Sequence, residues 1–250
     1  MDVLPGSLLI NRIMKKINVL LAVCAIFILA ACKEENEKPK VIYENSNKAK
    51  PASAKSDPAQ IEIADLPIQI TGTDVLIHPV GDLRVNDKGQ YSSGGSDVSF
   101  TISNYNEFEI TGYLRNLKFQ RTNSDSINVL TKKPVLIQTA TYLKSVSDKL
   151  KKQYLVYTLA DMDTNKDGQL DGGDIKSLYI STIDGKEFQK LSADFEELID
   201  WKLVEGVNRL YFRTMEDTNK NGEFDKKDVL HYNLLDFTTK EWKVSAYNPM

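Results

Sequence analysis

The chain carries one twelve-residue stretch twice, first as Asp163-Thr164-Asn165-Lys166-Asp167-Gly168-Gln169-Leu170-Asp171-Gly172-Gly173-Asp174 and again, 54 residues later, as Asp217-Thr218-Asn219-Lys220-Asn221-Gly222-Glu223-Phe224-Asp225-Lys226-Lys227-Asp228. Seven of the twelve positions are identical. We therefore interpret the two stretches as equivalent loops of an internal repeat.

Both stretches place oxygen-bearing residues where a calcium loop needs them. Ligands at positions 1, 3, 5, 9 and 12 converge on one ion, position 7 contributes its backbone carbonyl, and glycine at position 6 permits the sharp turn. A single stretch is also compatible with a polar turn that merely favours Asp, Asn and Gly, but two copies in register weaken that interpretation. We predict two Ca²⁺ sites, with the ligand positions Asp163, Asn165, Asp167, Gln169, Asp171 and Asp174 in the first loop and Asp217, Asn219, Asn221, Glu223, Asp225 and Asp228 in the second.

The loops resemble those of EF-hand proteins but end differently. The EF-hand pattern ends in Glu, whereas Asp174 and Asp228 end these loops, as in dockerin modules. The flanking runs 153–159 and 208–214 favour strands, where an EF-hand would place its entering helix. We therefore expect each ion to clip a long β-hairpin loop, and we do not expect a helix pair that opens and closes.

The repeat extends beyond the loops. Lys186-Glu187-Phe188 matches Lys240-Glu241-Trp242 at the same offset, and each unit of residues 151–250 is predicted as strand, calcium loop, strand, turn and strand. This order of strands and loops resembles that of β-propeller blades, although residues 61–115 do not align with the repeat. The predicted fold is mainly β, an antiparallel multi-sheet assembly with two blade-like C-terminal units that carry calcium loops. Whether it closes into a partial or small β-propeller stays open.

Residues 61–150 are predicted as an N-terminal β region. Short alternating or β-branched runs indicate strands at 61–63, 75–77, 98–102, 108–110, 117–119 and 135–137. From Tyr142 to Tyr154, Leu143, Val146 and Leu150 have helical spacing. That segment is predicted either as a short helix or as a strand pair joined by a lysine-rich turn.

Composition excludes several classes of protein. Lys and Arg number 32 against 35 for Asp and Glu, which argues against a nucleic-acid binder driven by positive charge. Both cysteines, Cys24 and Cys32, precede the predicted domain, so we expect neither a disulfide nor a cysteine metal site within it. The two histidines, His78 and His231, are far apart in sequence and are interpreted as structural, which argues against a His-rich zinc site.

The N-terminus has the features of an export signal. Met14-Lys15-Lys16 precedes an apolar run from Val19 to Ala31, and the run ends in Leu29-Ala30-Ala31-Cys32. This resembles the bacterial lipobox, which implies removal of residues 1–31 and acylation of Cys32. Residues 1–13 add nothing to such a signal, so we expect true initiation at Met14. A short transmembrane anchor or an ordinary secretory signal is the alternative.

Residues 32–60 are predicted as the lipidated cysteine and a disordered tether, with Val41-Ile42-Tyr43 as their only apolar cluster. Within them, Lys33-Glu34-Glu35-Asn36-Glu37 resembles the export signal of Bacteroidota surface lipoproteins. We predict a lipid-anchored outer-membrane protein exposed on the cell surface, with a periplasm-facing location as the alternative. The folded domain is expected to begin near Ile61.

Taken together, the chain resembles small Bacteroidota lipoproteins that bear EF-hand-like loops, and that resemblance implies no activity. No catalytic residue is predicted, since the sequence shows no nucleophile elbow, phosphate loop or His-Glu-x-x-His motif. We expect a calcium-binding surface or structural module whose protein or polysaccharide ligand is unidentified. The alternative is a surface hydrolase that processes carbohydrate and uses its calcium loops structurally. Four aromatic residues at strand spacing are interpreted as core, with a carbohydrate-stacking platform as the alternative: Trp201, Trp242, Tyr211 and Tyr232.

Overall fold

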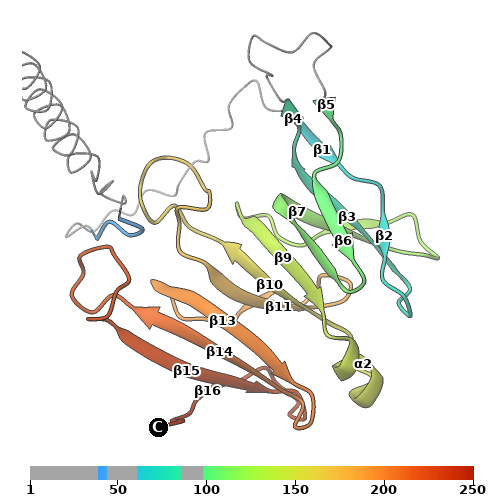
Figure 1. Ribbon diagram of the computed structural model, residues 1–250. Helices are drawn as coiled ribbons and strands as arrows, with labels where there is room; N and C mark the ends of the chain where they lie inside the picture. Colours follow the sequence, from blue (N-terminus) through green and yellow to red (C-terminus); the bar gives the residue numbers. More distant parts are fainter. Residues whose placement is uncertain (1–38, 44–60, 86–97) are drawn as a thin grey trace, which may run out of the picture. The chain divides into compact units, whose positions relative to one another are not determined.

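The computed structural model describes residues 39–43, 61–85 and 98–250 (Figure 1). The chain divides into two compact units, residues 1–38 and 39–250, and all described residues belong to the second. The predicted signal, Cys32 and most of the predicted tether lie outside the described residues.

Most strands of this unit form one antiparallel sheet. Its path runs in the order β1-β3-β7-β9-β10-β11-β12, while β2 pairs with β3, and β6 and β8 pair with β7. These strands are β1 (Glu62–Ala64), β2 (Ile68–Gln69), β3 (Val75–Asp82), β6 (Ser103–Asn106), β7 (Glu109–Arg121), β8 (Ile127–Val129), β9 (Leu136–Tyr142), β10 (Tyr154–Ala160), β11 (Ser177–Thr182) and β12 (Gln189–Lys190).

A second antiparallel sheet follows in chain order as β13-β14-β15-β16. Its strands are β13 (Glu196–Val204), β14 (Arg209–Glu216), β15 (Val229–Asp236) and β16 (Val244–Ala246). A separate two-stranded ladder joins β4 (Arg84–Val85) to β5 (Val98–Ser99).

Strand β10 faces two hydrophobic cores, because successive side chains of a strand point to opposite faces of its sheet. Leu155, Tyr157 and Leu159 are fully buried in the core of the large sheet. Val156 points the other way, into a second core that also holds Leu210 and Phe212 of β14. Both faces of β10 are apolar because each face lies in one of the two cores. Through these cores β10 packs the two sheets against each other.

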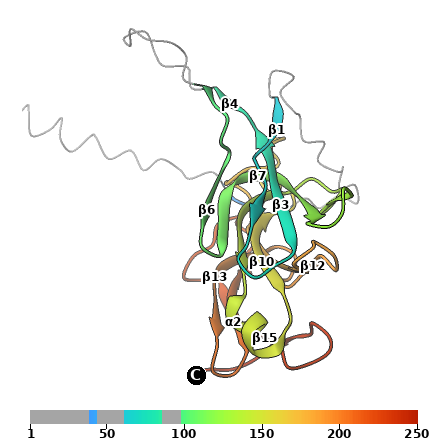
Figure 2. The same cartoon turned by 90° about the vertical axis from the view of Figure 1, so that its right-hand side faces the viewer.

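The segment from Tyr142 to Tyr154, for which a helix and a strand pair were both considered, contains the short helix α2 (Lys144–Leu150). Lys151 ends the helix in the left-handed conformation, with φ 57°. Leu143 and Val146 bury their side chains in the second core. Figure 2 looks at this end of the unit, and the loop that follows β10 leaves the opposite end of that strand (Figures 1 and 2).

The repeat predicted for residues 151–250 has the expected strand order. In both units a strand, a long loop and a second strand are followed by a short third strand, as β10-β11-β12 and as β14-β15-β16. The mainly antiparallel β class is confirmed, whereas no closed barrel or propeller is found among the described residues. The reason lies in β9, which pairs with β10 and makes the first unit part of the ten-stranded sheet instead of a separate blade.

Candidate metal centres

The first predicted loop joins β10 to β11 and is closed by side chains that accept hydrogen bonds from its own backbone. Asp163 Oδ2 accepts from the Gly168 amide at 3.0 Å, and Asn165 Oδ1 accepts from the Asp167 amide at 3.0 Å. Asp167 Oδ1 in turn accepts from the Gln169 amide at 2.9 Å. The polar residues at positions 1, 3 and 5 therefore point toward the inside of the turn.

The last residue of this loop is a buried carboxylate. Asp174 is fully buried, and its Oδ1 accepts from the Thr164 amide at 2.7 Å while Oδ2 accepts from the Asp171 amide at 2.9 Å. Burial raises the pKa of Asp174, and the backbone hydrogen bonds oppose that rise. This short side chain thus ties the end of the loop to its beginning.

The second loop, between β14 and β15, repeats these contacts position by position. Asp217 Oδ2 accepts from the Gly222 amide at 2.7 Å, Asn219 Oδ1 from the Asn221 amide at 2.9 Å and Asp228 Oδ2 from the Asp225 amide at 2.8 Å. The backbone conformation agrees as well. At position 6, Gly168 and Gly222 have φ of 86° and 83°, and at position 4, Lys166 and Lys220 both have φ of 58°. Equivalent residues therefore adopt one loop conformation twice.

The donor set suits a hard cation, which prefers oxygen ligands. A specific feature of the first loop points the same way: Asp163 Oδ1 is buried and has no hydrogen-bond partner. Such an atom is costly unless a donor or a cation satisfies it. Leu170, at position 8, is buried beside Leu136 and Ala160, as expected for a residue that fixes the loop on the sheet, whereas Phe224 is half-buried.

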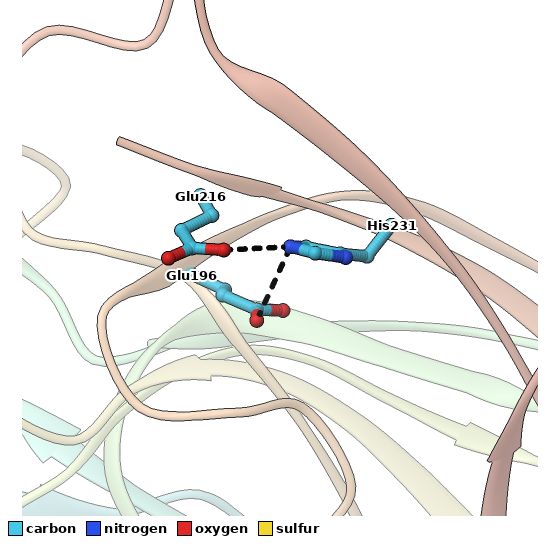
Figure 3. A group of neighbouring side chains, drawn as sticks. All are labelled: Glu196, Glu216 and His231. Carbon is cyan, nitrogen blue, oxygen red and sulfur yellow. Dashed lines mark hydrogen bonds and ion pairs between the residues drawn. The ribbon is translucent and has the colours of Figure 1, made fainter. Parts of the chain in front are cut away.

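A closer group of three possible metal-binding side chains lies outside both loops. Glu196 on β13, Glu216 on β14 and His231 on β15 bring one ligand atom each to within 4.8 Å of one another, the only such group of three among the described residues (Figure 3). His231 Nε2 lies 2.9 Å from Glu216 Oε2 and 3.8 Å from Glu196 Oε1. No three Asp residues of the two loops bring ligand atoms that close together, and most of their oxygens accept hydrogen bonds from backbone amides.

Cross-strand register creates this group. Glu196 pairs with Glu216, and Thr214 pairs with His231. The Thr214 hydroxyl donates a hydrogen bond to Glu196, and more than a third of the His231 side chain is exposed. An exposed ion pair of His with Glu accounts for the same arrangement, so we assign no metal to it. The sequence predicts a structural role for His231 and gives no sign of the two glutamates, because their proximity depends on strand register.

The four aromatic residues considered as a stacking platform do not share one face. Trp201 and Trp242 pack against the second core. Tyr211 and Tyr232 instead stack edge-on against Tyr247, with ring centroids 5.2 and 5.9 Å away. His78 lies 3.2 Å from the Gln120 amide oxygen.

A hollow of about 410 Å³ opens between β6 and β7, away from both loops. The residues that line it are uncharged and include no carboxylate, imidazole or thiol: Thr101, Ile102, Ser103, Asn104, Thr111, Gly112, Tyr113 and Gln138. Nothing in this lining provides the pair of carboxylates that glycoside hydrolysis requires.

Within the described part of the chain, no helix has the length and apolar character needed to cross a membrane. Comparison with protein-family models, with curated proteins and with solved structures finds no match to this chain.

Proposed function

We propose that this protein is a calcium-binding lipoprotein of the bacterial cell envelope, a surface binding or structural module in which two Ca²⁺ ions clip β-hairpin loops. The observation that carries the proposal is the buried, unpartnered Oδ1 of Asp163 at the first ligand position of a loop whose conformation recurs 54 residues later. An ion at that position would satisfy this oxygen.

The fold supports a structural use of the ions. Each loop joins two neighbouring strands of one sheet, so an ion bound there would hold the ends of β10 and β11, or of β14 and β15, together. We propose that the two three-stranded meanders are copies of one calcium-clipped unit, each resembling a propeller blade. A cation that binds only the folded state stabilises it by mass action.

The envelope location rests on the residues before the folded unit. Leu29-Ala30-Ala31-Cys32 resembles a lipobox, and the acidic cluster after it resembles a surface-export signal. Three acyl chains on Cys32 would anchor the protein stably, because a single chain binds a membrane only marginally. We propose an outer-membrane anchor with the β unit exposed at the cell surface, where millimolar calcium would fill sites with dissociation constants of roughly 10⁻⁴ to 10⁻³ M.

Isothermal titration of the detergent-solubilised protein with CaCl₂ tests the calcium sites. We expect two binding events for the wild type, one for Asp163→Ala or Asp217→Ala, and none for the double variant. Asp125→Ala, an exposed carboxylate in the turn between β7 and β8, is the matched control and should titrate like the wild type. A wild type that gives neither binding heat nor a calcium-dependent melting temperature would show that the loops are ordinary polar turns.

A further inference from the structure

A short segment from the predicted tether lies between the two loops. In Figure 1 this segment, Pro39–Tyr43, is the blue trace beside both of them. The Lys40 amide donates to the Gly222 carbonyl of the second loop at 2.8 Å, and the Ile42 amide donates to the Thr164 carbonyl of the first loop at 2.9 Å. The segment therefore bridges the two loops through its backbone.

Side chains fix the segment further. The Thr164 hydroxyl donates to the Lys40 carbonyl at 2.8 Å, and Val41 is 2% exposed. A Cβ atom added to Gly222 would lie 2.3 Å from the Val41 carbonyl oxygen. The glycine at position 6 of the second loop thus provides the space that the segment occupies, in addition to permitting the turn.

Two further contacts anchor the ends of the segment. Lys40 Nζ lies 2.8 Å from Glu197 Oε1, and the Glu197 side chain is 6% exposed. At the other end, the Tyr43 ring centroid lies 6.2 Å from that of Phe195, and burial together with the nearby Asp217 carboxylate raises the pKa of the Tyr43 hydroxyl to about 12. Lys40 therefore pairs with a buried carboxylate, Val41 occupies an apolar position, and Tyr43 lies near a carboxylate of the second loop.

We propose that the two loops together form a calcium-dependent binding site for an extended Lys-Val-Ile-Tyr segment, which the chain's own residues 39–43 occupy, and that loss of calcium releases this segment. The inference rests on the calcium binding proposed above and adds a ligand for the surface that the two loops share.

The coupling follows from where the accepting carbonyls lie. Thr164 stands between ligand positions 1 and 3 of the first loop, and its amide is held by Asp174. Gly222 stands at position 6 of the second loop, and its amide is held by Asp217. Without an ion the carboxylates of each loop repel one another, so each carbonyl can move away from the segment. Because the segment needs both carbonyls, its binding is linked to both ions, and by reciprocity the bound segment raises calcium affinity.

Hydrogen exchange read by mass spectrometry tests the inference on the full, detergent-solubilised protein. In saturating calcium, we expect the amides of Lys40 and Ile42 to be protected, and in chelator to exchange at least tenfold faster. Peptides from β10 report whether the fold persists, and their exchange should be unchanged.

A matched pair of variants isolates the contact. Gly222→Ala and Gly168→Ala introduce the same side chain at the same loop position and at nearly the same φ, but only the first places it against the segment, since nothing lies within 4 Å of a Cβ at Gly168. In saturating calcium Gly222→Ala should lose the protection of residues 40–42, and Gly168→Ala should keep it. Val41→Asp, a change outside both loops, should weaken calcium binding at least fivefold.

Three outcomes overturn the inference. Equal protection of residues 40–42 in calcium and in chelator would show that binding of the segment does not depend on the ions. Wild-type calcium affinity in Val41→Asp would show that segment binding and calcium binding are not coupled. In both cases the two binding events of the titration would leave the proposed calcium function intact. A wild type that binds no calcium would remove both proposals together.

Discussion

Asp163 and Asp217 hold the same position in the two loops, but their Oδ1 atoms have different surroundings. Asp163 Oδ1 is buried without a partner, whereas Asp217 Oδ1 accepts a hydrogen bond from the Asn221 amide at 3.2 Å. The other oxygen of each residue accepts from the glycine at position 6. A cation in the first loop would therefore remove a desolvation cost that the second loop does not carry.

The first prediction concerns the relative strength of the two sites. At positions 1, 3, 5, 9 and 12, where side chains would bind the ion, the first loop has four carboxylates and the second has three, because Asn221 replaces an acid at position 5 and Glu223 stands at position 7, which contributes its backbone carbonyl. More ligand charge favours tighter calcium binding, so the first site should fill first. When calcium is in hundredfold excess over the dissociation constant of one site, its binding there raises the free energy of unfolding by about 2.7 kcal/mol. For a domain of this size, that corresponds to an increase of roughly 5–10 °C in melting temperature. Melting curves in calcium should show a larger loss for Asp163→Ala than for Asp217→Ala.

The same melting experiment in chelator provides the contrast. There Asp163→Ala should lower the melting temperature less than in calcium, because it then removes only the hydrogen bond from the Gly168 amide to Oδ2, together with the Oδ1 atom that has no partner. Asp125→Ala should match the wild type in both buffers. Equal losses for Asp163→Ala with and without calcium would indicate that this side chain stabilises the loop by itself and not through an ion.

Local patterns predicted the strands of the repeat well. The runs predicted at 153–159 and 208–214 correspond to β10 and β14, because alternation and β-branched residues reflect local geometry. The runs at 108–110 and 117–119, by contrast, belong to one long strand, β7, whose register shifts between Thr111 and Leu114. Gly112 lies at that irregularity, and only the pairing of β7 with its neighbours explains the continuity.

Contacts between distant residues were beyond sequence reasoning. The proposed loop ligands could be predicted because they lie within twelve consecutive residues. The gathering of Glu196 and Glu216 near His231 depends on cross-strand register. Val41 was visible as part of an apolar cluster, but no sequence signal connects it with Gly222, 181 residues away.

The second prediction tests how β11 and β12 are joined. Gly185 has φ 76°, and a Cβ atom there would lie 2.4 Å from the buried ring of Phe119. Gly185→Ala should therefore combine backbone strain with overpacking and lower the free energy of unfolding by about 3 kcal/mol. Gly72→Ala is the control, since Gly72 has φ 86° and open space around it, and should cost about 1 kcal/mol. Urea denaturation measures both, and equal values would rule out the clash with Phe119.

The third prediction is a dependence of stability on pH. Partial burial would raise the pKa of Asp184, but hydrogen bonds from Thr182, Lys186 and Arg121 outweigh it and lower the pKa to about 2. Because this lies below the unfolded value of about 3.9, the carboxylate stabilises the fold above about pH 4, and that contribution is lost as the pH falls toward about 2. Asp184→Asn should destabilise the protein by about 1 kcal/mol at pH 7, since the ion pairs are partly exposed.

Urea denaturation of wild type and Asp184→Asn from pH 7 to pH 2, in chelator throughout, checks this sign. The difference between the two proteins should shrink between pH 4 and pH 2. Asp125→Asn, whose carboxylate is exposed, should follow the wild type at every pH. A difference for Asp184→Asn that is constant over this range would mean that the charge of Asp184 does not contribute.

The fourth prediction concerns the membrane anchor. If Leu29-Ala30-Ala31-Cys32 is a lipobox, the mature chain begins at an acylated Cys32. Mass spectrometry of protein from membranes should find this acylated N-terminus in the wild type and not in Cys32→Ser, which should leave the membrane fraction. The same unlipidated N-terminus in both proteins would contradict the prediction.

The last prediction concerns display at the cell surface. The acidic residues after Cys32 are the proposed export signal, so Glu34→Ala combined with Glu35→Ala should leave the protein lipidated but facing the periplasm. On intact cells, the wild type should then be cleaved by added protease, while the double variant should resist cleavage until the outer membrane is permeabilised. Changing Lys48 and Lys50 to Ala alters charge later in the predicted tether and serves as the control, which should be cleaved like the wild type. Wild-type protein that is no more accessible on intact cells than a periplasmic marker would place it on the inner side of the outer membrane.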